Sequence, residues 1–361
     1  MQGVQPRYSF IDFILKEWLL VISGVGVVLT SIYSGHLPAY SLQELEVLFI
    51  LFALFVVVQG LQKSGLIAKY SKRIEQGRHL PLKLVVTTFF LSMLVTNDVV
   101  LIVTVPLTLS LNIKRKDILV ILQALAANAG SALTPFGNPQ NLYIYWFYDL
   151  SPARFILSIA PFSGVFLLLL VLFSLIIETD GEPQPPSQTN RVEKSAYIYG
   201  LLFFAVLLTV LRLLPVATPF LVFLYALLFD RKALRVDYAL LISFFFFFGF
   251  AENIRFLLAS ELQHSDHIFL FSVLTSQIMS NVPVALLFAK FTSHWEPLLW
   301  GTNAGGFGSL FGSLANLIAY KLYVNHAETE NTGQFTAKFL LIGYAAFFVS
   351  IGLYFAIRKL S

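Results

Sequence analysis

Asn128-Ala-Gly-Ser-Ala-Leu-Thr-Pro-Phe-Gly-Asn-Pro-Gln-Asn-Leu-Tyr-Ile-Tyr145 is a polar, glycine-rich stretch inside an apolar region of the sequence. A later stretch matches it: Asn303-Ala-Gly-Gly-Phe-Gly-Ser-Leu-Phe-Gly-Ser-Leu-Ala-Asn-Leu-Ile-Ala-Tyr320. Aligned without gaps, the two copies are identical at eight of eighteen positions, where biased composition alone would give about one or two. The match predicts two related halves in one chain.

Each copy predicts a broken helix, at about 118–146 and 297–323. Glycines, hydroxyls, amides and, in the first copy, Pro135 and Pro139 stand where a continuous membrane helix would carry leucines. A break inside lipid frees backbone groups that need partners, and transporters use such groups to hold substrates and coupling ions near the midplane.

The composition is that of a membrane protein with many spans. Of 361 residues, 57% are hydrophobic and 12% charged, with a mean hydropathy of +0.77, far from the soluble range. The absence of cysteine excludes disulfides and thiolate chemistry. We attribute the net charge of +4 to cytoplasmic loops rather than to nucleic-acid binding. Neither a nucleotide-binding loop nor a hydrolase motif occurs in the sequence, so we expect neither an enzyme nor ATP-driven pumping by this chain alone.

Two further apolar segments carry a polar interruption in their middle. Residues 84–107 are interrupted by Thr96-Asn97-Asp98 and are flanked on both sides by lysines and arginines. Because basic flanks favour the cytoplasm, the segment predicts a re-entrant hairpin. The alternative is an ordinary span with a polar kink. Residues 268–291, interrupted by Ser280-Asn281-Val282-Pro283, are the counterpart in the second half.

The predicted fold is therefore an all-α polytopic membrane protein with two inverted repeats. We expect about nine transmembrane helices and two re-entrant hairpins in the cell membrane, with a cytoplasmic amino terminus and an external carboxyl terminus. The first repeat covers 1–178, a Pro-rich linker 179–195, a linking span 196–215 and the second repeat 216–361. An odd linking span is what would invert the second repeat.

The polar motifs suit the binding of a small anion together with a cation. Helix N-termini carry partial positive charge, which favours an anion, while freed carbonyls and amide or hydroxyl oxygens can coordinate sodium. Asp98 is the one acid predicted inside the membrane, where acids are costly and usually functional. It would coordinate a cation or carry a proton, or else it caps the hairpin tip. Lys290, Glu252 and Arg255 are expected near membrane ends, where snorkelling would explain them.

The paired motifs, Thr96-Asn97-Asp98 with Gly137-Asn138-Pro139-Gln140-Asn141 and Ser280-Asn281-Val282 with Gly312-Ser313-Leu314-Ala315-Asn316, resemble those of the ion transporter superfamily. That group includes divalent-anion/sodium symporters, citrate transporters and arsenite permeases, and the sequence is most similar to its short anion-transporter branch. The resemblance implies substrate contacts from six residues: Thr96, Asn97, Asn141, Ser280, Asn281 and Asn316. It implies ion sites at Asp98, Thr134, Gly137, Asn138, Ser309, Gly312 and Ser313.

The resemblance further implies an elevator-type homodimer that moves a small anion, either a di- or tricarboxylate or an inorganic oxyanion, coupled to sodium or protons. No cofactor is expected, and no metal beyond sodium. The motifs depart from the Ser-Asn-Thr signature of the family's symporters at both hairpin tips. The alternatives are an arsenite efflux permease, alone or associated with a separate ATPase, a sodium/proton antiporter in which Asp98 is the carrier, and a passive channel.

Overall fold

The computed structural model describes residues 17–66, 79–111, 113, 115–177, 193–258, 267–326 and 331–360. Within these ranges the chain forms fifteen helices and connecting loops, without strands, which confirms the all-α prediction. The residues before 17 and most of the predicted linker, 179–192, lie outside the described residues.

Four of the described helices are long and apolar enough to cross a membrane: α3 (Leu42–Lys63), α9 (Pro152–Ile176), α12 (Tyr238–Leu258) and α17 (Thr332–Leu360). Three shorter helices fall on predicted spans: α2 (Trp18–Ser34), α10 (Ser195–Val210) and α11 (Phe220–Phe229). The sequence places the end of the α12 span at about residue 250, before Glu252 and Arg255, whereas α12 continues to Leu258 and includes both charged residues.

The remaining helices are pairs that meet at the polar motifs. Each of the two interrupted segments is a helical hairpin whose arms contact each other: α5 (Leu80–Ser92) with α6 (Asn97–Ser110), and α13 (Ile268–Met279) with α14 (Asn281–Ala289). Each eighteen-residue copy breaks its helix: α7 (Lys116–Ser131) is followed by α8 (Pro139–Phe147), and α15 (Trp295–Gly305) by α16 (Leu314–Val324). The order of elements therefore occurs twice, on either side of α10. The inverted orientation of the second set stays a prediction.

The local sequence explains where these helices begin. Asn138 accepts the backbone N–H of Asn141 through Oδ1 at 2.9 Å, and Pro139 occupies the first turn of α8. The proline that cannot continue α7 thus suits the start of the next helix. At the start of α3, Ser41 and Glu44 form a capping box, in which each side chain accepts the backbone N–H of the other residue.

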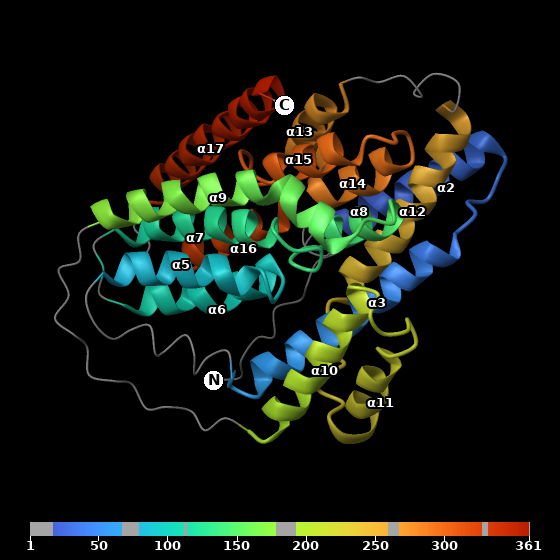
Figure 1. The fold of residues 1–361 in the computed structure, drawn as a ribbon, viewed down its shortest axis with the longest axis horizontal. Coiled ribbons are helices and arrows are strands. Elements are labelled where there is room, and N and C mark those ends of the chain that lie inside the picture. Colours follow the sequence, from blue (N-terminus) through green and yellow to red (C-terminus); the bar gives the residue numbers. More distant parts are fainter. Residues whose placement is uncertain are drawn as a thin grey trace, which may run out of the picture.

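The helices fall into two groups by their contacts (Figure 1). The frame group consists of α2, α3 and α10–α12, and the hairpin group of α5–α9 and α13–α17. The largest contacts between them join α12 to α14 and α3 to α8. Because the hairpin group holds both hairpins and both broken helices, all four polar motifs lie in one body.

Candidate functional site

Each hairpin tip is hydrogen-bonded to the helix break of its own half. The backbone N–H of Asn97 donates to the carbonyl of Gly137 at 3.2 Å, and that of Asn281 donates to the carbonyl of Gly312 at 3.0 Å. The tips differ in backbone strain, because Ser280 has a φ of 72°, a conformation that costs a non-glycine residue about 1–3 kcal/mol. Strain of this kind is concentrated at functional sites.

The hydroxyls of the two breaks also bind the arm that enters each tip. Thr134 donates through Oγ1 to the carbonyl of Met93 at 2.7 Å, and Ser309 donates through Oγ to the carbonyl of Gln277 at 2.8 Å. Because these hydroxyls occupy matching positions of the two copies, the same contact occurs in both halves. Break and hairpin are thus held together by matching pairs of bonds.

Four buried asparagines join the two halves to each other. Asn128 donates through Nδ2 to Oδ1 of Asn316 at 2.9 Å, and Asn303 donates through Nδ2 to Oδ1 of Asn141, also at 2.9 Å. All four side chains are at most 4% exposed. Each broken helix therefore completes the hydrogen bonding of the other, and we call this set the asparagine cluster.

The remaining amide groups of this cluster stabilise the breaks themselves. Asn141 donates to the carbonyls of Ser131, Ala132 and Thr134 at 2.9–3.2 Å. Asn316 donates to those of Gly306 and Ser309 at 2.9 and 3.0 Å. Carbonyls at a helix end lack partners within the helix, and these side chains supply donors there; the carbonyls of Thr134 and Ser309 also accept backbone N–H groups, from Gly137 and Gly312. The geometry thus gives Asn141 and Asn316 a structural role, while their assignment as substrate ligands stays a prediction.

A small cavity of about 20 Å³ lies where the two halves meet. Four helix N-termini line it, those of α6, α8, α14 and α16, together with apolar side chains of the frame group: Leu19, Leu240 and Phe244. Of the residues predicted to bind substrate or ion, five line this cavity: Asn97, Asp98, Ser280, Asn281 and Ser313. Eight do not: Thr96, Thr134, Gly137, Asn138, Asn141, Ser309, Gly312 and Asn316.

The electrostatics of the cavity favour an anion accompanied by a cation. Four helix N-termini each contribute partial positive charge, and neither lysine nor arginine is among the lining residues. Asp98 supplies a carboxylate whose Oδ1 is buried without a hydrogen-bond partner among the described residues. The described residues hold no group of three or more histidines and acids that could bind a metal ion.

The sequence analysis did not predict the role of the two asparagines that begin the copies. Asn128 and Asn303 were recognised as matching positions, but not as partners of Asn316 and Asn141. Their signal was present, since a buried amide requires hydrogen bonds. The sequence alone does not say where the partners lie.

Comparison with known proteins places the chain in a family. A family model described as a citrate transporter, CitMHS, matches residues 10–301, well over half of the chain. The chain belongs to the CitMHS citrate transporter family. This membership confirms the resemblance to the ion transporter superfamily and identifies a membrane transporter.

The relatives are also transporters or membrane proteins. The uncharacterized transporter MJ0456 of Methanocaldococcus jannaschii is 32% identical, over 90% of this chain and 92% of the relative. The inner membrane protein YbiR of Escherichia coli is 34% identical, over 84% and 86%. The silicon efflux transporter LSI3 of Oryza sativa subsp. japonica is 34% identical over a shorter region, 42% of this chain and 33% of the relative.

Proposed function

We propose that this CitMHS family member is a secondary active transporter of a small anion, which binds in the cavity between the two hairpin tips. The observation that carries the proposal is the convergence of four helix N-termini, from both halves, on one cavity whose lining contains no lysine or arginine. Backbone N–H groups at helix N-termini bind anions without a cationic side chain. Such a site releases its ligand more readily than one built on arginine, which suits a carrier.

Asp98 supports coupling of the anion to a cation or a proton. Its carboxylate lines the same cavity, and two like charges about 4 Å apart repel by about 4 kcal/mol at an effective dielectric of about 20. An anion and an ionised Asp98 would therefore oppose each other. Protonation of Asp98, or sodium beside it, removes the conflict, so binding of the anion favours binding of its co-ion.

We propose that transport occurs by an elevator-type movement, in which the hairpin group moves relative to the frame group, and that the protein is a homodimer. The tips and the breaks belong to the hairpin group, whereas Leu19, Leu240 and Phe244 on the other side of the cavity belong to the frame group. Sliding of one group along the other would carry the tips and breaks across the membrane together, away from the apolar side chains of the frame group. The hydrogen bonds that hold the site lie within the hairpin group, which supports this mode.

Export of an inorganic oxyanion is the second candidate. It is favoured by the partial match to a protein named as a silicon efflux transporter and by the small volume of the cavity, about 20 Å³. A tricarboxylate would need a considerably larger space in the binding state.

The test is uptake of labelled succinate, citrate, arsenite and silicate into proteoliposomes, under imposed sodium or proton gradients. We expect gradient-dependent uptake of one of them, which Asn97→Ala and Asn281→Ala abolish. Asp98→Asn should leave some flux but remove its dependence on the gradient. The control is Asn253→Ala, since Asn253 bonds Thr30 and Ser31 within the frame group.

Flux that ignores both gradients in the unaltered protein would instead identify a passive channel. Sodium/proton exchange without anion movement, lost in Asp98→Asn, would identify an antiporter. Either result would overturn the proposal.

A further inference from the structure

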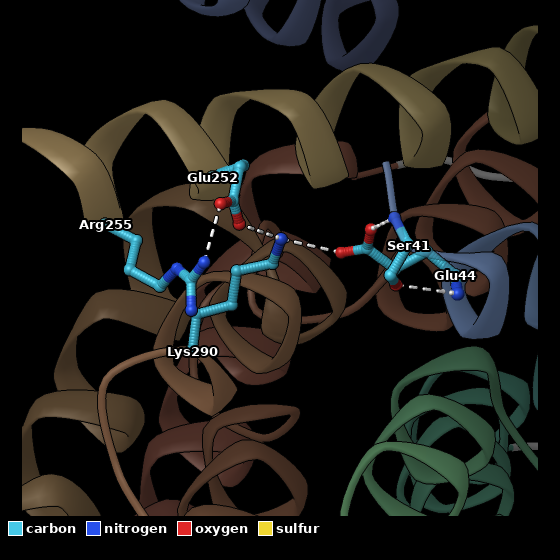
Figure 2. A network of polar contacts seen from close by, with 5 residues as sticks. All are labelled: Ser41, Glu44, Glu252, Arg255 and Lys290. Atoms are coloured by element: carbon cyan, nitrogen blue, oxygen red, sulfur yellow. Dashed lines mark hydrogen bonds and ion pairs between the residues drawn. The ribbon is translucent and has the colours of Figure 1, made fainter. Parts of the chain in front are cut away.

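A buried ionic network joins the hairpin group to the frame group (Figure 2). Lys290, at the end of α14, points between two carboxylates. Its Nζ lies 2.7 Å from Oε1 of Glu44 in α3 and 2.8 Å from Oε2 of Glu252 in α12. Arg255 completes the network, with Nη2 at 2.7 Å from Oε1 of Glu252.

The burial of Lys290 and Glu252 argues against snorkelling, which was the sequence-based interpretation of both residues, whereas the side chain of Arg255, interpreted in the same way, is 54% exposed. The side chains of Lys290 and Glu44 are only 6% and 2% exposed, and that of Glu252 is 17% exposed. Two acids face two bases, so the charges balance. Buried ion pairs contribute little net stability, yet the loss of one partner is costly, because an unpaired charge stays behind.

The position of the network is what suggests a function. Lys290 belongs to the hairpin group, and its two carboxylate partners belong to two different helices of the frame group. These ion pairs therefore cross the boundary along which the two groups would slide. Glu252 lies eight residues beyond Phe244, the nearer of the two cavity residues in α12, or about 12 Å along the helix. The network is thus separate from the anion site.

The lysine of the network has no counterpart at the matching position of the first hairpin. Lys290 follows the tip residue Asn281 by nine positions, and the residue nine positions after Asn97 is Pro106. If the two related halves exchanged their conformations during transport, the two end states of the transport cycle would be equivalent in structure. Because the first hairpin has Pro106 where the second has Lys290, the ion pairs of this lysine make the two states unequal.

A second set of contacts between the groups lies at the same end of α3. The guanidinium of Arg212, which follows α10, pairs with Asp149 at 2.5 Å and donates to the carbonyl of Trp146 at 3.4 Å. Gln43, next to Glu44 in α3, also donates to the carbonyl of Trp146. The end of α8 is thereby held to the frame group beside the Lys290 network.

We propose that Lys290, Glu44 and Glu252 form an ionic latch, which holds the hairpin group against the frame group in the conformation of this structure and must open during each transport cycle. The inference rests on the elevator movement of the proposed function. Opening the latch separates Lys290 from both carboxylates, so the network sets the population of this conformation. Its removal should favour the alternative conformation without changing the anion site.

The test uses the absence of cysteine, which allows spin labels to be placed on two introduced cysteines. Leu157 in α9 and Tyr33 in α2 are 73% and 82% exposed and belong to different groups. Distances between the two labels are measured by pulsed electron spin resonance in lipid nanodiscs without substrate. We expect the distribution to contain a second distance besides the original one. Lys290→Met and Glu44→Gln should each raise the population at the second distance, relative to the population at the original distance, by about tenfold, which is within the usual range of conformational coupling.

Two features of the design separate a latch from a merely structural contact. Glu44→Gln removes the charge but keeps an oxygen for the backbone N–H of Ser41, so the cap of α3 is preserved. Lys338→Met is the matched control, because Lys338 pairs with Asp117 at 2.6 Å between α17 and α7, inside the hairpin group. It should lower the melting temperature without changing the distances.

Identical distance distributions in the unaltered protein, Lys290→Met and Glu44→Gln would overturn the latch, as would an equal shift in Lys338→Met. This measurement needs no transported ion. A shift in the two latch variants, combined with no uptake of any tested anion, would keep the latch and reject the proposed substrate class.

Discussion

Close packing at single glycines holds each broken helix against its hairpin. A Cβ on Gly130 would lie 2.1 Å from the carbonyl oxygen of Phe89 and 2.4 Å from Oγ of Ser92. A Cβ on Gly305, the matching residue of the second copy, would lie 2.5 Å from Cβ of Ser276. The glycines thus allow α7 and α15 to approach α5 and α13, so that the hydroxyls of the breaks can reach the hairpins.

Gly130→Ala is therefore expected to abolish transport and to lower the melting temperature. The carbonyl of Phe89 belongs to the backbone of α5 and cannot move away without shifting that helix, and overpacking typically costs about 1–3 kcal/mol. The measurement is thermal unfolding in detergent together with uptake. Gly164→Ala in α9 is the control, because nothing lies within 4 Å of the added Cβ; it should stabilise the helix slightly. Equal melting temperatures for the two variants would contradict the argument.

At this scale the sequence predicted residue types better than partners. Asn97 and Asn281 line the cavity, while their predicted contact with substrate or ion stays a prediction. The bond from Asn128 to Asn316 joins residues 188 positions apart, and spacing within one copy carries no information about contact with the other. Lys290 was misjudged because its two acidic partners lie on other helices.

The arms of the first hairpin are held to the broken helix by one glutamine. Gln123 in α7 is fully buried; its Oε1 accepts the hydroxyl of Thr108 in α6 at 2.9 Å. Its Nε2 donates to Oγ1 of Thr88 in α5 at 3.3 Å. A single side chain therefore fixes three helices in register.

Gln123→Leu should loosen the first hairpin while leaving the fold intact. Leucine fills a similar volume, but the buried hydroxyl of Thr108 loses its partner, at a cost of about 1–3 kcal/mol, while the hydroxyl of Thr88 keeps its bond to the carbonyl of Leu84. Hydrogen exchange of α5 and α6, followed by mass spectrometry, should become at least severalfold faster, while exchange in α13 and α14 is unchanged. Uniform acceleration in both hairpins would show general destabilisation instead.

The elements themselves could be predicted because lipid penalises unpaired backbone groups. Wherever the sequence interrupts an apolar segment with amides and glycines, the structure begins a new helix, as at Asn97 and Leu314. The end of α12 could not be predicted in this way, because Glu252 is neutralised by Lys290 from another helix. Pairing removes the charge penalty that normally ends a span.

The division into two groups is the feature of the whole molecule that sequence patterns did not reveal. Lipid-facing helices are apolar on most sides, so periodicity does not indicate which neighbour each one contacts. The orientation in the membrane also remains a prediction from the distribution of basic residues, with the amino terminus in the cytoplasm and the carboxyl terminus outside.

Single cysteines can test this orientation directly, since the chain has none of its own. Ala39, between α2 and α3, and Lys232, between α11 and α12, are both exposed. In intact cells, a membrane-impermeant maleimide should label Ala39→Cys, whereas Lys232→Cys should react only after permeabilisation. The reverse pattern would invert the whole topology, and labelling of both in intact cells would contradict the predicted number of spans between them.

The asparagine cluster has a consequence for how the protein is made. Asn128 and Asn141 enter the membrane with the first half, but their partners follow 188 and 162 residues later. Until α15 and α16 leave the ribosome, the first broken helix therefore lacks two buried hydrogen bonds that it has in the folded protein. A chain stalled or truncated between the halves would thus expose a polar defect to membrane quality control, and supplying the missing half as a separate polypeptide should protect it from degradation.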